Sequence, residues 1–367
     1  MEAKSTEPVR PWQVRQGFPW PGLQFFEATS PLALDNGGQL FPWQLAYEEW
    51  GPASGQPVVV FHALTGDSHV ASHPEGGPPG WWERVLGPGK GLDSEKFHVL
   101  CFNVLGGAMG SSGPASCDES GKPWGSRFPD ITLFDMARAA HLLIHAWRRG
   151  PVRLIGGSMG GMLALAYAAL YPAEVSAVMA IGAPIQHDPW AIAYHTVGRT
   201  AIMADVHFRG GDYYDGPAPE QGLALARMAD MISYQHPESM NRKFGRGLQP
   251  GKGDQFQIAS YLSYQGEKLV GRFDANTYLV LTRAMDRFEL SEAHIQAIRT
   301  IPVWMVGLES DLLYLPEEIA RHARRLEDGG VAVRLSWLSG PWGHDTFLVE
   351  QEAMGRLAAQ FLKDAES

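Results

Sequence analysis

A serine inside a glycine-rich hexapeptide is the residue whose surroundings most clearly predict chemistry. Residues 156–161 read Gly-Gly-Ser-Met-Gly-Gly, which fits the pattern G-x-S-x-G around Ser158. A strand-like run precedes the pattern and an Ala-rich, helix-like run follows it. In that context the chain turns sharply and presents the serine oxygen above a sheet. Small residues suit such a turn because the two backbones approach closely. Ser158 is therefore the candidate nucleophile, and an incidental serine in a glycine-rich turn is the alternative.

A nucleophilic serine requires two partners further along the chain. Its hydroxyl reacts poorly until a general base takes the proton, so a histidine and a carboxylate must accompany Ser158. After a turn of this type, the carboxylate precedes the histidine in chain order. Asp311 and His344 occur in this order, each shortly after a strand-like run. We predict that His344 is the base and that Asp311 orients it, with Glu309 as the competing carboxylate.

Two backbone amides are expected to stabilise the negative charge that develops during acyl transfer. The amide of Met159 lies at the start of the predicted helix, where the helix dipole favours negative charge. A second donor should come from the loop after an early strand. The segment 62–66, His-Ala-Leu-Thr-Gly, follows such a strand, and we predict the amide of Leu64 as this donor.

Other chemistry has little support in the sequence. His62, His69 and His73 are close in the chain, but they fit no metal-ligand motif, and we expect no metal. Neither the P-loop pattern G-x-x-x-x-G-K-[ST] nor the dinucleotide pattern G-x-G-x-x-G occurs, so we expect no bound cofactor. Lys plus Arg is 30 and Asp plus Glu is 40, a net charge of −10. This balance argues against nucleic-acid or anionic-membrane partners.

The elements that must position these residues are visible as apolar runs. Short, β-branched runs predict buried strands at 58–61, 98–103, 152–155, 175–181, 303–307 and 331–335. Helical patterns cover 130–149, 160–171 and 316–326. Strands that alternate with helices predict an α/β fold with a mostly parallel sheet covered on both faces.

The strand pattern stops between residues 184 and 299, a segment that we call the lid. Helix-compatible patches such as 219–234 predict a mostly helical insertion, with an irregular loop at 244–253. The core domain would then consist of residues 1–183 and 300–367. A chain of 367 residues can bury a full core without disulfides, and its two cysteines are too few for a disulfide framework. No signal peptide or membrane span is visible, so we expect a cytoplasmic protein.

Short motifs spread over most of the chain occur together in one order. They are HALTGDSH at 62–69, GSSGP at 110–114, the hexapeptide at 156–161, ARM at 226–228, SYLSYQG at 260–266, RFDAN at 272–276, SDLL at 310–313 and GHDTFL at 343–348. In this combination the chain resembles the homoserine O-acetyltransferases. The resemblance implies an α/β-hydrolase fold with an inserted helical lid, and a homodimer formed through the lid.

The resemblance also implies a reaction. The family moves an acetyl group from acetyl-CoA to the side-chain hydroxyl of L-homoserine by a ping-pong route, in methionine biosynthesis. Arg227 matches the family residue that binds the acceptor carboxylate, which a guanidinium can hold with two hydrogen bonds. Asp345 matches the residue that receives the acceptor ammonium, and Tyr234 is predicted to line the same pocket.

Several alternatives stay open at this stage. The chain departs from the family near Ala108, Met109 and Ser112, on the expected acyl-donor side, so succinyl-CoA could replace acetyl-CoA. L-Serine could replace homoserine as the acceptor. An esterase or deacetylase could use the same three residues, and a non-catalytic binding protein could retain the fold.

Overall fold

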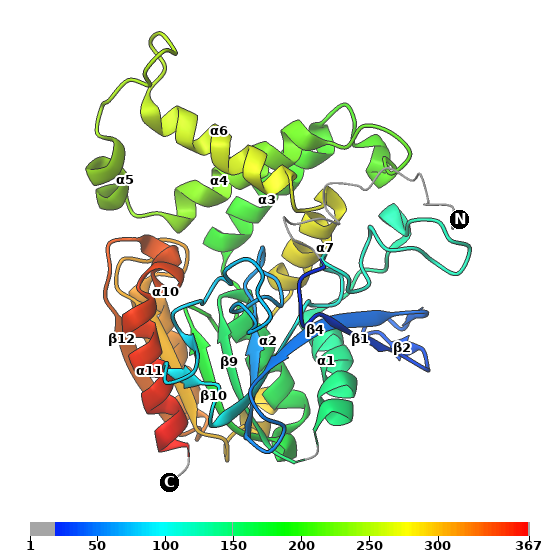
Figure 1. The fold of residues 1–367 in the computed structure, drawn as a ribbon, viewed down its shortest axis with the longest axis vertical. Coiled ribbons are helices and arrows are strands. Elements are labelled where there is room, and N and C mark those ends of the chain that lie inside the picture. The colour runs from blue at the N-terminus through cyan, green and yellow to red at the C-terminus, as the bar shows by residue number, and fades with distance from the viewer. Residues whose placement is uncertain (1–18, 149, 366–367) are drawn as a thin grey trace.

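One large sheet runs through the core of the molecule and carries helices on both faces (Figure 1). The computed structural model describes residues 19–148 and 150–365, and in this part eight strands form the sheet in the order β1-β4-β8-β5-β9-β10-β11-β12. β4 pairs antiparallel with both of its neighbours, β1 and β8, and all the other pairs of neighbours are parallel. The strands are β1 (Gln24–Glu27), β4 (Gln44–Trp50), β5 (Gln56–Phe61), β8 (Phe97–Phe102), β9 (Val152–Gly157), β10 (Val175–Ile181), β11 (Val303–Leu308) and β12 (Val333–Leu338).

The six strands expected from apolar runs are all present, because both faces of the parallel strands are covered. Every residue of β8 and β11 is buried, as a strand between two helical layers requires. β12 begins at Val333 rather than Val331, since the amide of Val331 still bonds to the Leu326 carbonyl at the end of the preceding helix. Two short ribbons complete the strands: β2 (Leu32–Ala33) with β3 (Gln39–Leu40), and β6 (Leu86–Gly87) with β7 (Leu92–Asp93).

Two apolar layers enclose the sheet. On one face, residues of α1, α2 and α9 form a single cluster with side chains such as Val59 and Leu154. On the other face, α11 packs with alternate strand residues such as Val60 and Ile155. The core helices are α1 (Leu133–Trp147), α2 (Met159–Leu170), α9 (Pro316–Asp328), α10 (Thr346–Val349) and α11 (Gln351–Asp364), and the short 3₁₀ turns are η2 (Gly125–Arg127), η3 (Pro172–Glu174) and η5 (Gly343–Asp345).

The expected helix at 130–149 is shorter in the structure. Thr132 and Asp135 form a capping box, in which each side chain accepts from the other residue's backbone amide, and α1 therefore begins at Leu133. α10 and α11 follow the last strand and were not predicted. Their apolar side chains pack in the second layer of the core. No strand follows them, so the alternation of strands and helices that marked the other helices was missing.

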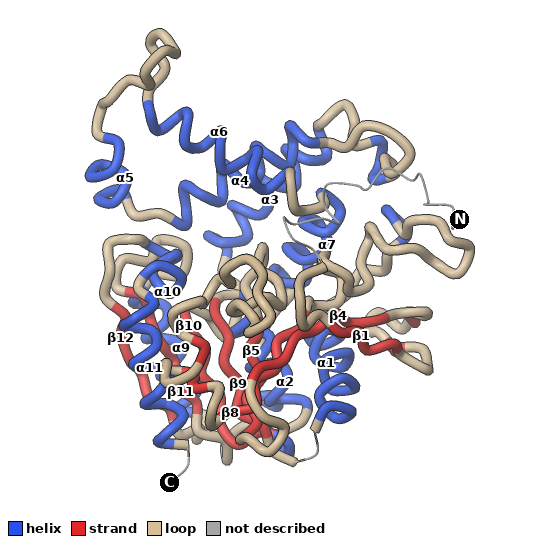
Figure 2. The backbone as a smooth tube through the Cα atoms, viewed as in Figure 1, coloured by secondary structure: helices blue, strands red, loops and turns tan. Residues whose placement is uncertain are grey.

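The lid contains helices and no strand of the main sheet among the described residues. Most of its helices lie above the sheet in Figure 2, whereas its last helix packs against α2 of the core. Its elements are α3 (Pro189–Ala204), η4 (Arg209–Gly211), α4 (Glu220–Tyr234), α5 (Pro237–Phe244), α6 (Gln257–Val270), α7 (Ala275–Asp286) and α8 (Glu292–Ala297). Irregular turns follow α5, as predicted for 244–253. The fold class expected from the sequence is thus confirmed.

Polar contacts join the lid to the loops at the carboxyl ends of the strands. Arg272 donates to the carbonyl of Thr65, with 2.6 Å between Nη1 and O. Trp190 donates from Nε1 to the carbonyl of Leu312 at 2.7 Å.

No described helix has both the length and the apolar character that crossing a bilayer demands. The cytoplasmic location stays a prediction.

Candidate active site

Ser158 stands at a strained turn between β9 and α2. Its backbone has φ 55° and ψ −125°, a conformation that residues other than glycine rarely adopt. The Ser158 amide donates to the Ile181 carbonyl of β10 at 2.8 Å, which holds the turn against the sheet. A Cβ atom on Gly156 would lie 2.2 Å from the carbonyl oxygen of Gly160, so the turn leaves no space for a side chain there. The strain and the glycine follow from the same close approach of strand and helix.

The structure brings Ser158, His344 and Asp311 into one hydrogen-bonded chain. The Oγ atom of Ser158 lies 2.8 Å from Nε2 of His344, and Nδ1 of that ring lies 2.7 Å from Oδ2 of Asp311. Since 186 positions separate the serine from the histidine, only the fold can produce this contact. All three side chains are at least 95% buried. This arrangement allows the imidazole to take the serine proton and the carboxylate to stabilise the resulting imidazolium.

The loops after β11 and β12 place the acid and the base. Asp311 is fixed by the amides of Leu313 and Tyr314, which donate to its Oδ1 at 2.8 and 3.1 Å. Glu309, the competing carboxylate, is exposed. The two strands are parallel neighbours, so their carboxyl ends meet at one edge of the sheet. That adjacency brings Asp311 to His344.

The basicity of His344 predicts the pH dependence of the first chemical step. Burial alone would lower the pKa of this imidazole, but the carboxylates of Asp311 and, beyond it, Asp345 outweigh burial and raise the pKa above its ordinary value. His344 must be neutral to accept a proton, so activity should fall as the pH drops through this pKa. We expect the half-maximum of kcat/KM for the acyl donor above about pH 6.5.

The variant Asp311→Asn tests this explanation. Burial then dominates, so the half-maximum should move to lower pH, together with a rate loss of up to about 10⁴-fold. A pH–rate profile for the acyl donor measures both changes. An unchanged half-maximum would contradict the role of Asp311 in raising the pKa.

The two predicted amide donors lie at neighbouring backbones. Met159 is the first residue of α2, where the first amides of a helix have no partner within the helix. Leu64 follows β5 in a buried loop. A Cβ atom on Gly160 would lie 2.1 Å from the Phe61 carbonyl oxygen, so the chain entering this loop packs directly on the start of α2. The Arg272 contact to Thr65 fixes the loop from the lid side.

The three residues predicted to bind the acceptor lie close to the base and to one another; we call this group the acceptor pocket. The ring of Tyr234 lies 5.7 Å from the His344 ring, between centroids, and 5.4 Å from Cζ of Arg227. Asp345 accepts from Nε2 of Gln235 at 2.6 Å. Burial raises the pKa of Asp345, while Arg227 and His344 oppose the rise. A guanidinium and a carboxylate thus interact electrostatically beside the base.

Asp230 is a buried carboxylate in this region that sequence reasoning missed. Its Oδ1 accepts from the hydroxyl of Tyr278 at 2.9 Å, while its Oδ2 has no hydrogen-bond partner. Burial raises its pKa to about 6, against the attraction of Arg227. Nη1 of Arg227 is likewise buried without a partner. Asp230 and Arg227 are three positions apart on α4, a spacing that places both on one face, and this was the available signal.

The network behind the base was also missed. The rings of Tyr314 and His344 meet edge to face, with 5.2 Å between centroids. The Tyr314 hydroxyl lies 3.0 Å from Nε2 of His187, which starts the lid. These residues are separated by more than a hundred positions and no motif relates them, so no pattern in the sequence indicates the contact.

The three early histidines do not form one cluster. Nδ1 of His69 and Nε2 of His73 contact the same Glu48 oxygen at 2.7 and 2.9 Å. His62 is held elsewhere, with Nε2 accepting from the amide of Val104 at 3.1 Å. Glu48 occupies the position between the histidines.

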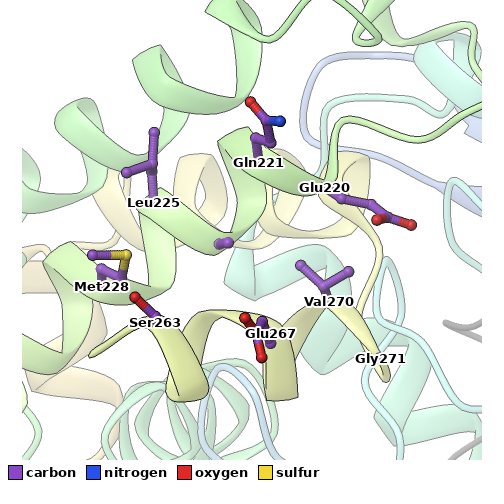
Figure 3. A pocket seen from close by; sticks show the side chains of 9 residues that line it. Glu220, Gln221, Leu225, Met228, Ser263, Glu267, Val270 and Gly271 are labelled. Carbon is purple, nitrogen blue, oxygen red and sulfur yellow. The ribbon is translucent and has the colours of Figure 1, made fainter. Parts of the chain in front are cut away.

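A hollow of about 700 Å³ lies within the lid, between α4 and α6 (Figure 3). Leu225, Met228 and Val270 give it an apolar lining, and Glu220 and Glu267 lie at its side. None of the predicted site residues lines it. α4 therefore presents Arg227 to the pocket and Leu225 to the opposite side.

Comparison of the sequence with known proteins identifies the family of this chain. The α/β hydrolase fold family matches residues 56–351. A homoserine O-acetyltransferase of Rhodopseudomonas palustris is 42% identical over 364 residues, covering 94% of this chain and 90% of its own. One of Symbiobacterium thermophilum is 44% identical, covering 92% and 93%. The chain belongs to the homoserine O-acetyltransferase family. The resemblance to this family that the short motifs indicated is thus confirmed.

Solved structures of this fold have different activities. A homoserine O-acetyltransferase of Bacillus anthracis superposes with a TM-score of 0.85 at 20% identity, covering 93% of this chain and 97% of its own. An esterase, E22, superposes equally well, with a TM-score of 0.85 at 24% identity and coverages of 93% and 99%. The backbone alone therefore does not separate acyl transfer to an acceptor from hydrolysis. That distinction depends on the pocket residues.

Proposed function

We propose that this protein transfers an acetyl group from acetyl-CoA to the side-chain hydroxyl of L-homoserine. The observation that carries the proposal is the placement of Arg227 and Asp345 beside the hydrogen-bonded chain of Ser158, His344 and Asp311. An amino acid brings one carboxylate and one ammonium, and the pocket holds one group of opposite charge for each. The family membership supports the same acceptor and donor.

The reaction proceeds in two half-reactions in this proposal. His344 takes the proton of Ser158 as the oxygen attacks the thioester carbonyl, and the Leu64 and Met159 amides stabilise the oxyanion. The thiol of CoA leaves with that proton, and an acetyl-serine remains. Homoserine then occupies the pocket, His344 takes the proton of its hydroxyl, and attack on the ester releases O-acetyl-L-homoserine and free Ser158.

Transfer must be faster than hydrolysis of the acetyl-serine. The lid contacts the loops at the carboxyl ends of the strands, and the ring of Tyr234 on α4 lies close to the base. An acceptor fixed by two charged contacts has its hydroxyl held in attack geometry, an advantage that free water lacks. Water exclusion under the lid serves the same selection. An esterase needs neither charged contact, which is why the pocket favours the transferase over the esterase with the same three residues.

The proposal is tested by following thiol release. The protein is incubated with acetyl-CoA or succinyl-CoA, with L-homoserine, with L-serine, or without an acceptor. We expect rapid release only with acetyl-CoA and homoserine, and an acetyl adduct on Ser158 when the acceptor is omitted. Equal release without any acceptor would identify a hydrolase. Release with succinyl-CoA or with serine alone would assign that donor or acceptor instead.

The remaining expectations follow from this proposal. A homoserine acetyltransferase would act in methionine biosynthesis, without a bound cofactor, and acetyl-CoA would be a co-substrate. The homodimer through the lid stays a prediction, as do the division into core and lid domains and the absence of nucleic-acid partners.

A further inference from the structure

Three groups of histidine and carboxylate side chains each bring three possible metal-ligand atoms within 4.8 Å of one another in the described part of the chain. They are Glu48 with His69 and His73, His187 with His195 and Asp286, and His141 with His145 and Glu174. None includes Ser158, His344, Asp311 or a residue predicted to bind the acceptor. The hydrogen bonds and ion pairs of each group decide whether its ligand atoms are free to bind a cation.

In the Glu48 group, hydrogen bonds already occupy both ring nitrogens of His69. Nδ1 of His69 lies 2.7 Å from a Glu48 oxygen, and Nε2 lies 2.7 Å from the carbonyl oxygen of Pro78. Both partners are acceptors, so both ring nitrogens carry protons and the ring is an imidazolium. A metal needs a free lone pair on the ring, and this arrangement has none.

The Asp286 group contains a permanent cation. Nη2 of Arg199 lies 2.6 Å from Oδ2 of Asp286, while Nδ1 of His195 lies 2.7 Å from Oδ1. The guanidinium remains charged at every accessible pH. A divalent ion on the same carboxylate would be repelled at close range, so this group is an ion-pair network.

The third group lies on the surface of the core and has neither obstacle. His141 and His145 are one turn apart on α1, a spacing that places both rings on one helix face. Glu174 comes from η3, directly after α2. Nδ1 of His141 lies 3.2 Å from Oε2 of Glu174. A tetrahedral zinc ion with ligand bonds of 2.0–2.1 Å separates its ligand atoms by about 3.3 Å, so this pair already has the required spacing.

Neighbouring side chains hold two of the ligands in place. The Tyr171 ring stacks on His141, with 3.8 Å between centroids and 7° between planes. The hydroxyl of Tyr167 donates to Oε2 of Glu174 at 3.3 Å. Such outer contacts orient metal ligands in known sites. His145 is exposed and can rotate to complete the set, which leaves an open path for the ion from solvent.

The basic residue next to this group on α1 is already engaged by other carboxylates. Arg138, one turn earlier on α1, is paired with Asp35 and Asp135.

We propose that His141, His145 and Glu174 bind a divalent transition-metal ion of the zinc class, with water in the remaining position. Imidazole nitrogen and carboxylate oxygen are ligands that zinc accepts. The ion would join α1 to the end of α2. α2 has 12 residues, so about 18 Å of helix separates this site from Ser158, and the ion is structural.

The test is a calorimetric titration of the full chain, free of any histidine tag, with zinc chloride. We expect one high-affinity zinc ion per chain. His145→Ala and Glu174→Gln should each weaken it at least tenfold, and zinc should raise the unfolding temperature of the unaltered protein but not of the variants. His207→Ala is the matched control, because His207 is an exposed histidine beside a single carboxylate, Asp205, and lacks a second histidine.

His145 is exposed, so its replacement leaves the fold intact and keeps the test decisive if Glu174→Gln is unstable. Acyl transfer by His145→Ala should match that of the unaltered protein. Equal zinc affinity in His145→Ala, or no stoichiometric binding at all, would overturn the proposal. Binding that persists in His145→Ala and blocks acyl transfer would place the ion at His344 and would overturn it as well.

Discussion

Replacing Ser158 with alanine is expected to lower kcat for acyl transfer by roughly 10⁵- to 10⁶-fold. The hydroxyl is the only atom of the hydrogen-bonded chain that can form the acyl bond, and His344 has nothing to deprotonate without it. The strained backbone at this turn is set by β9 and α2, so the variant should fold normally. Thiol release from acetyl-CoA in the presence of homoserine measures the loss.

A second measurement separates chemistry from binding. Mass spectrometry of the Ser158→Ala variant mixed with acetyl-CoA should show no acetyl adduct, whereas the unaltered protein should carry one. Ser120→Ala, on an exposed loop, serves as the matched control and should retain full activity. An adduct or near-normal turnover in Ser158→Ala would exclude this residue as the nucleophile.

The variant Arg227→Ala is expected to lose the acceptor half-reaction while it retains the first. A guanidinium and a carboxylate form charge-assisted hydrogen bonds of about 1.5–3 kcal/mol each, so the loss of two should cost about 3 kcal/mol or more. That is roughly a 100-fold loss in kcat/KM for homoserine. Formation of the acetyl adduct should proceed at the normal rate, because Arg227 does not contact Ser158 in the structure.

Arg242→Ala provides the matched control, since Arg242 lies on the exposed side of the lid helix α5. It should leave both half-reactions unchanged. Normal saturation of Arg227→Ala with homoserine would contradict the carboxylate role. Slow adduct formation in the same variant would instead show that Arg227 acts in the donor step, which the proposed function does not predict.

Local patterns predicted the elements that carry the site. The G-x-S-x-G turn, the strand before it and the helix after it follow from residues 152–171 alone, because glycine and β-branched residues restrict the backbone locally. The parallel strands were visible because both of their faces are buried, which requires uninterrupted apolar runs. β1, β4 and α11 lack such runs, and their places in the fold were not predicted.

The polar network around the base could not be predicted in this way. Asp230 pairs with Tyr278 across two lid helices, and His187 pairs with Tyr314 across lid and core. Each contact depends on how helices pack over long sequence separations, and single side chains show no pattern that identifies such a partner. The same holds for the carboxylate between His69 and His73, since Glu48 comes from a different strand.

The sequence by itself determined the nucleophile turn, the alternation of strands and helices around it, and the candidate base His344, because local backbone preferences and chain order constrain them. Only the tertiary structure decided that Asp311 rather than Glu309 contacts His344, and which lid side chains face the pocket. The physical reason is that hydrogen bonds act over about 3 Å, whereas the residues they join here lie far apart in the chain. Their meeting depends on the packing of the whole core.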